Sequence, residues 1–285
     1  MLTRLLTLAA LTLAPGLVLA QEQEWVAGKP VPAGTSLQRP VTPVMEDLVW
    51  LDNMLLVIIT IITLFVLGLL VYVVLRFNRK ANPTPATFTH NAKLEVVWTA
   101  VPVLILVVIA IPSLRLLDKQ LVIPEPELTI KATGYQWFWG YEYPDHGVVF
   151  DAYPVGFYAS DEEERTQELA DYGYSRDEYL LATDNRLVVP VDTNVQLLIT
   201  GADVIHNWAM PSFGIKTDAI PGRVNESWFR VTEVGTYFGQ CSELCGINHA
   251  YMPITVEVVS KEDYQIWLDE QIAKAEGRTD VATTD

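Results

Sequence analysis

The chain has 285 residues, of which 50% are hydrophobic, and a formal net charge of −16 at pH 7. The charge is uneven: residues 118–285 hold 29 acidic and 11 basic side chains (−18), which leaves 6 acidic and 8 basic ones (+2) elsewhere. This acidity argues against a nucleic-acid partner, because both would be anionic. It leaves two interpretations open, a solvated acidic face or a surface that attracts a basic protein.

The N-terminal segment has the features of a secretory signal peptide. Residues 1–20 combine a basic start, a short apolar run and small residues before a plausible cleavage site. A first membrane helix is the alternative, but Pro15–Gly16 and the short length argue against it. We expect export, followed by an extended Pro- and Gly-rich leader over residues 21–50.

Residues 51–117 are predicted to form a two-helix transmembrane hairpin. The stretch 53–75 carries no charge and would be about 34 Å long as a helix, enough to cross a bilayer. The stretch 96–114 is shorter and contains Pro102 and Pro112. Membrane helices tolerate proline where neighbouring helices satisfy the freed carbonyl, which favours a partner in the membrane, although a hairpin packing against itself remains open.

Charges flanking the two stretches predict their orientation. The connecting loop is basic, whereas the outer flanks are acidic, so the loop is expected in the cytoplasm and both ends outside. Trp50 and Trp98 lie where interfacial aromatic side chains are expected. The flanking charges are Arg76, Arg79, Lys80 and Lys93 in the loop, and Glu46, Asp47, Asp52 and Asp118 outside.

Residues 118–260 are predicted to form an all-β domain. Short β-like runs alternate with turn residues at the spacing of an antiparallel sandwich or barrel. An acidic insertion at about 151–178 contains a predicted helix, Ser160–Tyr172, capped by its serine. Residues 261–285 are read as a helix, Lys261–Ala275, and a tail. The predicted strands are Leu128–Thr133, Leu187–Pro190, Val195–Thr200, Ser227–Val231, Gly235–Gly239 and Ile254–Val259.

Five soft metal-ligand side chains occur in two segments of this domain. Cys241, Cys245, His249 and Met252 lie in the segment GQCSELCGINHAYMP, and His206 lies upstream in DVIHNW. Four interpretations compete: a disulfide, a tetrahedral zinc site, a mononuclear blue-copper site and a binuclear copper site. The residue types favour copper, because a thioether binds copper better than zinc, without excluding zinc or the disulfide.

Together with the aromatic run GYQWFWGYEYP at residues 134–144 and the two-helix anchor, these motifs closely resemble cytochrome c oxidase subunit II. The resemblance covers about Trp50 to Val259. It implies a cupredoxin-like Greek-key barrel after the two-helix transmembrane hairpin, in a bacterial inner membrane with the β-domain in the periplasm. It also implies electron entry into a terminal respiratory oxidase, from reduced cytochrome c to the haem of subunit I, for oxygen reduction coupled to proton pumping.

The resemblance implies two copper ions in the centre called Cu-A and a magnesium ion shared with subunit I. Other membrane subunits are also expected as partners. Glu243 matches the residue whose backbone carbonyl binds copper and whose carboxylate reaches magnesium. The implied copper ligands are His206, Cys241, Glu243, Cys245, His249 and Met252.

Five further residues receive roles from the resemblance alone. Trp137 matches the tryptophan through which electrons enter, although core packing is the ordinary role of such a residue. Glu95 matches a carboxylate at the mouth of a proton path, or is an ordinary helix flank. The carboxylates that match the docking surface for cytochrome c are Glu142, Asp184 and Asp203.

Rival functions are an envelope copper-binding or copper-delivery protein, a quinol oxidase subunit and a β-domain held by a disulfide. The two-helix anchor with Glu95 argues against a tethered carrier, and the complete ligand set argues against the quinol-oxidising branch. The sequence contains no Cys-x-x-Cys-His motif, so no covalently attached haem is expected.

Overall fold

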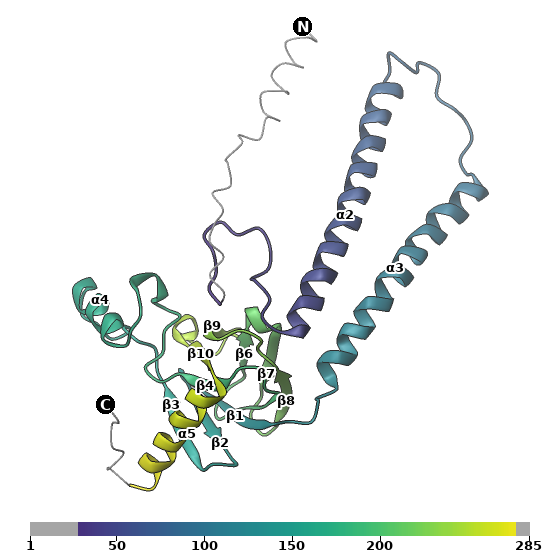
Figure 1. Cartoon of the computed structure of the whole chain (residues 1–285). Coiled ribbons are helices and arrows are strands. Elements are labelled where there is room, and N and C mark those ends of the chain that lie inside the picture. The colour runs from purple at the N-terminus through teal and green to yellow at the C-terminus, as the bar shows by residue number, and fades with distance from the viewer. Residues whose placement is uncertain (1–27, 278–285) are drawn as a thin grey trace.

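The protein is described by a computed structural model over residues 28–277, so the predicted signal peptide lies outside the described residues. Two long helices project from one end of a β-domain (Figure 1). This arrangement confirms the predicted fold class, a two-helix hairpin followed by an all-β domain.

The hairpin helices are α2 (Pro43–Arg76) and α3 (Ala92–Leu121). Both are longer than the predicted stretches 53–75 and 96–114, because polar turns at their ends continue the helix. α2 begins where the Thr42 hydroxyl accepts the Met45 N–H and Pro43 occupies the first turn. The part of the predicted leader from residue 43 onward is therefore helical. Both helices are long and apolar enough to cross a membrane.

The end of α3 ties the hairpin to the β-domain. The Lys119 ammonium donates to the Pro43 carbonyl at 2.9 Å and pairs with Asp47 at 2.6 Å, which links α3 to the start of α2. The Lys119 carbonyl accepts a hydrogen bond from the Trp228 indole at 3.0 Å. One residue thus joins both helices to strand β8 (Asn225–Phe229) of the domain.

The described part of the leader also packs on the β-domain. Val41 is 1% exposed, belongs to the domain core and donates its N–H to the Ser212 carbonyl at 3.2 Å. The Val41 carbonyl accepts from the Thr232 N–H at 3.0 Å, and Arg39 pairs with Glu233. This part of the leader therefore packs into the core of the β-domain.

The β-domain consists of two five-stranded sheets, ordered β3-β2-β1-β5-β8 and β4-β10-β9-β6-β7. β1 alternates buried and half-buried side chains along its length, as expected of a strand with one face on a core. The strands are β1 (Leu128–Tyr135), β2 (Phe138–Tyr143), β3 (Val148–Ala152), β4 (Leu187–Pro190), β5 (Val195–Gly201), β6 (His206–Met210), β7 (Ile215–Ala219), β8 (Asn225–Phe229), β9 (Gly235–Cys241) and β10 (Pro253–Val259).

Six of these strands follow the predicted runs, with β4 matching residue for residue. The predicted run Ser227–Val231 is shifted, because β8 covers Asn225–Phe229. Strands β2, β3, β6 and β7 were missed. Each has only five or six residues, so its sequence alternation is weak and pairing with neighbours decides its conformation.

The acidic insertion folds around helix α4 (Glu162–Asp171). Its cap is Asp161, whose carboxylate accepts the Glu164 N–H at 2.9 Å, so the predicted serine cap is wrong. Ser160 instead donates its backbone N–H and its hydroxyl to the Glu164 carboxylate. A carboxylate is the stronger acceptor for the helix N-terminus, and it adds a favourable interaction with the helix dipole.

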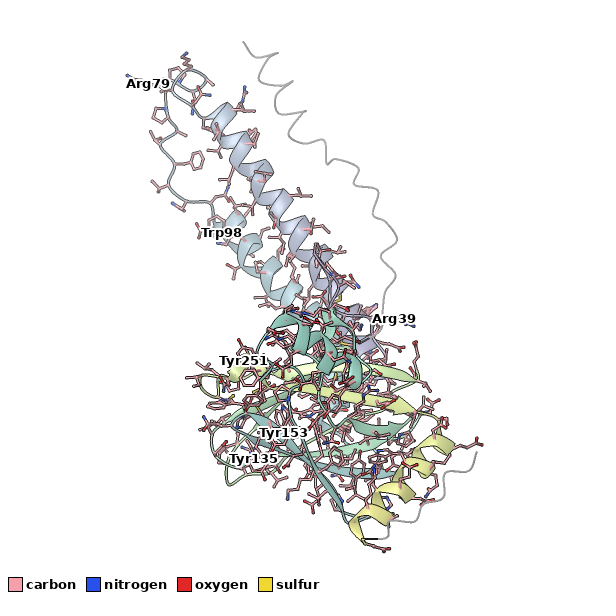
Figure 2. The ribbon with its side chains drawn as sticks, turned by 90° about the vertical axis from the view of Figure 1, so that its left-hand side faces the viewer. Arg39, Arg79, Trp98, Tyr135, Tyr153 and Tyr251 are labelled. Carbon is pink, nitrogen blue, oxygen red and sulfur yellow. The ribbon has the colours of Figure 1, made fainter. Side chains whose placement is uncertain are left out.

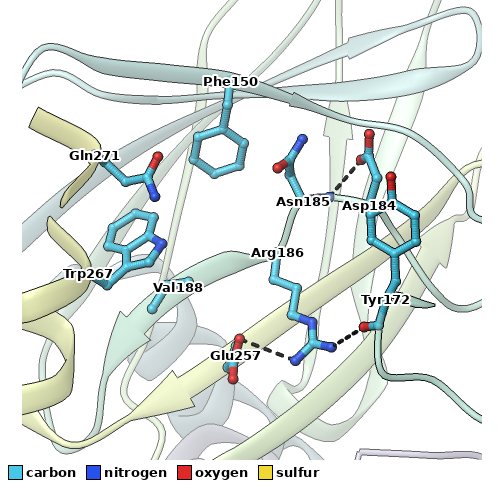
Figure 3. A pocket seen from close by; sticks show the side chains of 9 residues that line it. All are labelled: Phe150, Tyr172, Asp184, Asn185, Arg186, Val188, Glu257, Trp267 and Gln271. Carbon is cyan, nitrogen blue, oxygen red and sulfur yellow. Dashed lines mark hydrogen bonds and ion pairs between the residues drawn. The ribbon is translucent and has the colours of Figure 1, made fainter. Parts of the chain in front are cut away.

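Arg186 attaches the end of the insertion to the sheet, as Figure 3 shows. Its guanidinium donates to the Tyr172 carbonyl at 2.9 Å and to the Tyr174 hydroxyl at 2.8 Å, and pairs with Glu257 at 3.3 Å. The small pocket beside it, of about 280 Å³, also borders Trp267 of helix α5 (Lys261–Ala275). α5 has its predicted bounds.

Candidate metal centre

The metal-ligand side chains come together at one edge of a sheet, where β9 ends and where β6 and β10 begin. His206 is the first residue of β6, and Cys241 is the last residue of β9. The loop that follows β9 passes through the short 3-10 helix η3 (His249–Tyr251) and returns into β10. The Cys241 N–H donates to the Met252 carbonyl at 3.0 Å, which closes the loop at its base.

The donor atoms of this loop point toward one another. The two cysteine sulfurs lie 3.9 Å apart, and the Cys245 sulfur lies 3.5 Å from Nδ1 of His249. The Cys241 sulfur lies 4.0 Å from Nδ1 of His206 and 3.4 Å from the Glu243 carbonyl oxygen. The ligand atoms of His206, Cys241 and Cys245 all lie within 4.8 Å of one another.

Both cysteines carry free thiols. Their separation of 3.9 Å is far beyond a disulfide bond of about 2.05 Å, so the structure disfavours the disulfide interpretation. Met252 is 1% exposed and its thioether is enclosed with the thiols in the domain core. The arrangement can hold a soft metal ion, and its thioether and carbonyl donors exceed what tetrahedral zinc requires.

His206 is oriented by a hydrogen bond on the side away from the sulfurs. Its ring is fully buried, and Nε2 lies 2.8 Å from the Asp203 carboxylate, which can only accept if it is ionised. Nε2 therefore carries a proton, and the ring is turned so that Nδ1 faces the Cys241 sulfur. A Cβ on Gly134 would lie 2.8 Å from the His206 ring, so glycine is required for this close approach.

The hydrogen bonds also shift the pKa values of this pair. Burial lowers the pKa of His206, but its bonds with Cys241 and Asp203 outweigh burial and raise it. Burial raises the pKa of Asp203, and the hydrogen bond from His206 together with the N–H groups of Val204 and Gln136 brings it below its usual value. The Asp203 side chain is therefore an anion at neutral pH.

The two thiols differ in acidity. Burial opposes ionisation of Cys241, but hydrogen bonds with His206 and with the backbone at residues 243 and 207 lower its pKa to about 7. Burial and the negative charge of Cys241 raise the pKa of Cys245 to about 12. One thiolate forms readily in this space, and a second requires a cation to balance its charge.

Trp137 lies in the turn between β1 and β2, directly over the metal loop. Its indole N–H donates to the Cys245 carbonyl at 3.3 Å, and the Gln136 side chain donates to the same carbonyl at 2.6 Å. A Cβ on Gly246 would approach both side chains to 3.0 Å, so the loop passes tightly beneath them. Trp139, by contrast, is fully buried in the core.

The three acids that match the docking surface all have partners within the chain. Glu142 pairs with Lys131 at 3.1 Å. Asp184 accepts from the Tyr153 N–H at 2.7 Å, and burial raises its pKa. Asp203 holds His206, as described above. Phe138 stacks on both Tyr135 and Tyr153, which Figure 2 labels on the β-domain.

Glu95 and Glu243 lie in different surroundings. The Glu95 carboxylate accepts from the Asn91 N–H at 3.3 Å at the start of α3, far from the β-domain in Figure 1. The Glu243 side chain is exposed beside the metal loop. The structure thus brings the metal ligands and Trp137 together and leaves Glu95 separate.

Sequence reasoning missed two sets of residues around the centre. The Gln136 side chain donates to the Cys245 carbonyl, which also accepts from Trp137, and the Gln136 backbone N–H donates to Asp203 at 2.7 Å. Gln136 therefore links the residue that contacts Trp137 with the carboxylate that holds His206. Phe157 of the insertion packs on Tyr251 of η3 with ring centroids 4.6 Å apart. Gln136 could have been suspected from its place beside Trp137, whereas nothing in the sequence pairs Phe157 with Tyr251.

Comparison with known proteins gives consistent matches. The family profile described as "Cytochrome C oxidase subunit II, periplasmic domain" matches residues 128–259, and the one described as "Cytochrome C oxidase subunit II, transmembrane domain" matches residues 30–116. The chain is 52% identical over 275 residues to cytochrome c oxidase subunit 2 of Cereibacter sphaeroides, covering 94% of this chain and 91% of that protein.

Further relatives agree. A probable cytochrome c oxidase subunit 2 of Rickettsia felis is 50% identical over 243 residues, covering 85% of this chain and 73% of that protein. The crystal structure of the periplasmic domain of subunit II of cytochrome oxidase from Bradyrhizobium japonicum is 42% identical, with a TM-score of 0.45, and covers 54% of this chain and 99% of that one.

The two apolar helices coincide with the transmembrane profile, which fits an inner-membrane protein. A copper centre follows from the family, and the group formed by His206, Cys241 and Cys245 is a place where a metal can bind. The profile matches and the high identity over nearly the whole length establish that the chain belongs to the cytochrome c oxidase subunit II family, and so is a subunit of the haem–copper oxidase complex.

Proposed function

We propose that this subunit accepts electrons from reduced cytochrome c at a binuclear copper centre and passes them to the haem of subunit I. The observation that supports this most directly is the convergence of two thiols and two imidazole Nδ1 atoms in one buried space. A single zinc ion would leave the Met252 thioether and the Glu243 carbonyl without a role.

The donor set fits two copper ions, which when bound supply one-electron oxidation and reduction. The residues that would hold them are Cys241, Cys245, His206, His249, Met252 and, through its backbone carbonyl, Glu243. The chain's own contribution is rigidity. Asp203 fixes one imidazole and the bond between Cys241 and Met252 fixes the loop, so little rearrangement accompanies a change of charge.

Trp137 is the proposed entry point for electrons. Its indole is hydrogen-bonded to the carbonyl of Cys245, so a short path connects the outer turn with a residue that would hold copper. The donor would dock on the acidic face of the β-domain, where Glu142 pairs with Lys131 and lies outside the metal-ligand contacts. Long-range attraction to a lysine-rich donor follows from the net charge of −18 in residues 118–285.

Three further roles belong to the same proposal. The exposed Glu243 carboxylate is available for a magnesium ion shared with subunit I. Glu95 lies at the helix end where a proton path into subunit I would begin, although its bond with Asn91 also serves as a helix cap. Residues 1–20 would be removed on export, with the β-domain in the periplasm and the loop after α2 in the cytoplasm.

The decisive experiment combines spectroscopy and kinetics on the purified oxidase. Electron paramagnetic resonance should show hyperfine structure from two equivalent coppers, and replacing Cys245 with serine should abolish it. Trp137→Phe should slow electron entry from reduced cytochrome c at least tenfold with copper content unchanged. A spectrum from one copper, or unchanged kinetics in Trp137→Phe, would refute the corresponding part of the proposal.

A further inference from the structure

A pocket of about 320 Å³ opens between the two helices where they meet the β-domain. Its lining comes from the first turns of α2 and the last turns of α3. Figure 1 shows that the helices lie closer together at this end and diverge toward the loop between them. The residues lining the pocket are Asp47, Trp50, Leu51, Pro112, Arg115, Leu116 and Lys119.

The pocket has a polar end and an apolar end in the same order on both helices. On α2, Asp47 lies one turn nearer the β-domain than Leu51. On α3, Lys119 lies one turn nearer the β-domain than Arg115, and Pro112 lies deepest in the apolar stretch. The polar side chains therefore face the membrane surface, and the apolar ones continue toward the membrane interior.

The position of the pocket relative to a bilayer follows from helix length. α2 has 34 residues and is about 51 Å long, whereas the hydrocarbon core is about 30 Å thick. Because residues 53–75 form the uncharged span, Asp47 and Trp50 lie at the level of the lipid headgroups. Trp50 is 58% exposed there, as expected of an interfacial tryptophan.

The two cationic side chains of the pocket differ in the hydrogen bonds and ion pairs that they make. Lys119 is held by Asp47 and by the Pro43 carbonyl. Arg115 is exposed, and within residues 28–277 its guanidinium makes no ion pair or side-chain hydrogen bond. A guanidinium with free donors at headgroup depth is complementary to a phosphate diester, which it can bind through two parallel hydrogen bonds.

We propose that this pocket binds a phospholipid, with the phosphate diester on Arg115 and an acyl chain along Leu51 and Pro112. The polarity of the pocket matches that of a lipid, from charged headgroup to apolar chain. A bound lipid would fill the opening between the diverging helices, so it would stabilise the hairpin. Free inorganic phosphate shares the headgroup chemistry but offers nothing to the apolar end.

The test uses the intact, delipidated oxidase and native mass spectrometry during titration with dioleoylphosphatidylglycerol. Arg115→Gln should weaken retention of one lipid roughly tenfold, because one charge-assisted contact is lost. Arg79→Gln, which removes an arginine at the opposite end of the hairpin (Figure 2), is the matched control and should retain the wild-type number. A photoreactive phosphatidylglycerol should label peptides containing Trp50 and Leu51.

Three results would overturn the proposal. Equal lipid retention by the wild type and Arg115→Gln would show that Arg115 holds no headgroup. Displacement of the lipid by inorganic phosphate alone would assign the pocket to the free anion. A cross-link from position 50 to another oxidase subunit, in place of lipid, would show that protein fills the pocket. None of these results depends on electron transfer through the copper centre.

Discussion

Asp203 contacts both the metal-ligand set and the electron-entry turn. One carboxylate oxygen holds Nε2 of His206 at 2.8 Å, and the other accepts the Gln136 N–H at 2.7 Å. The residue that resembles a docking acid therefore has a second task inside the protein. Its effect on donor binding and its effect on the metal centre can be separated by experiment.

Replacing Asp203 with asparagine should weaken copper binding roughly tenfold, because outer hydrogen-bond partners of metal-binding histidines commonly contribute a factor of 10–100. Copper affinity and the optical spectrum of the centre report the change. Glu142→Gln is the matched control, since Glu142 pairs with Lys131 and does not touch the centre. Unchanged affinity in Asp203→Asn would contradict the positioning role.

Acidity should weaken copper uptake by the apoprotein. The pKa of Cys241 is lowered to about 7, so below that pH its thiol is protonated and the metal must displace the proton. Cys245, with its pKa raised to about 12, releases a proton at any ordinary pH. Apparent affinity should therefore fall more steeply below pH 7 than above it. Proton release measured by calorimetry in several buffers checks this, and a pH-independent affinity would contradict it.

At the scale of elements, the insertion is more than an acidic decoration. Phe157 packs on Tyr251 in the metal loop, and directly after the insertion the Leu180 carbonyl accepts a hydrogen bond from Gln240 of β9 at 3.2 Å. Tyr174 packs on Phe238 of the same strand. The insertion thus braces the loop that carries His249 and Met252.

Phe157→Ala should destabilise the β-domain by about 1 kcal/mol, the usual value of one aromatic pair. It should also broaden the paramagnetic resonance signal of copper, because η3, which contains His249, loses the packing contact of Phe157 with Tyr251. The neighbouring Tyr158 is 84% exposed and packs edge-on against Phe157, whereas the ring paired with Tyr251 is that of Phe157. Tyr158→Ala is therefore the matched aromatic variant: it should lower stability less and leave the copper signal unchanged. Thermal unfolding and paramagnetic resonance are the measurements. A stable Phe157→Ala variant with an unchanged spectrum would show that the insertion does not brace the loop.

Sequence patterns predicted some elements closely and others poorly, for identifiable reasons. β4 and α5 have their predicted bounds, since β4 is a run of branched residues and α5 begins at a serine cap. β6 was missed although it carries His206, because its five residues are nearly all buried and show no alternation. The metal ligands were recognisable from residue type and spacing, whereas the contacts of Gln136 and Phe157 depend on tertiary packing.

At the scale of the molecule, the acidic charge is carried by the β-domain. The reaction with a lysine-rich cytochrome c should therefore depend strongly on salt, with the apparent KM rising roughly tenfold between 0.02 and 0.2 M ionic strength. Glu142→Gln should reduce the salt dependence of KM. Glu262→Gln in α5 is the control: Glu262 is not one of the three acids that match the docking surface, so its replacement should have a smaller effect. Steady-state turnover at several salt concentrations checks the prediction, and a KM independent of salt would contradict it.

The β-domain is attached to the hairpin at more than one point. The leader enters through Val41, which is bonded to Ser212 and Thr232, and α3 leaves through Lys119, which is bonded to Trp228. A domain suspended on one linker would swing, and its distance from the neighbouring haem would fluctuate. Anchored by both chain segments, it would keep one height and one tilt above the bilayer. Tunnelling rates fall exponentially with distance. A fixed position of the β-domain would therefore keep the distance from the copper centre to the haem, and with it the electron-transfer rate, nearly constant.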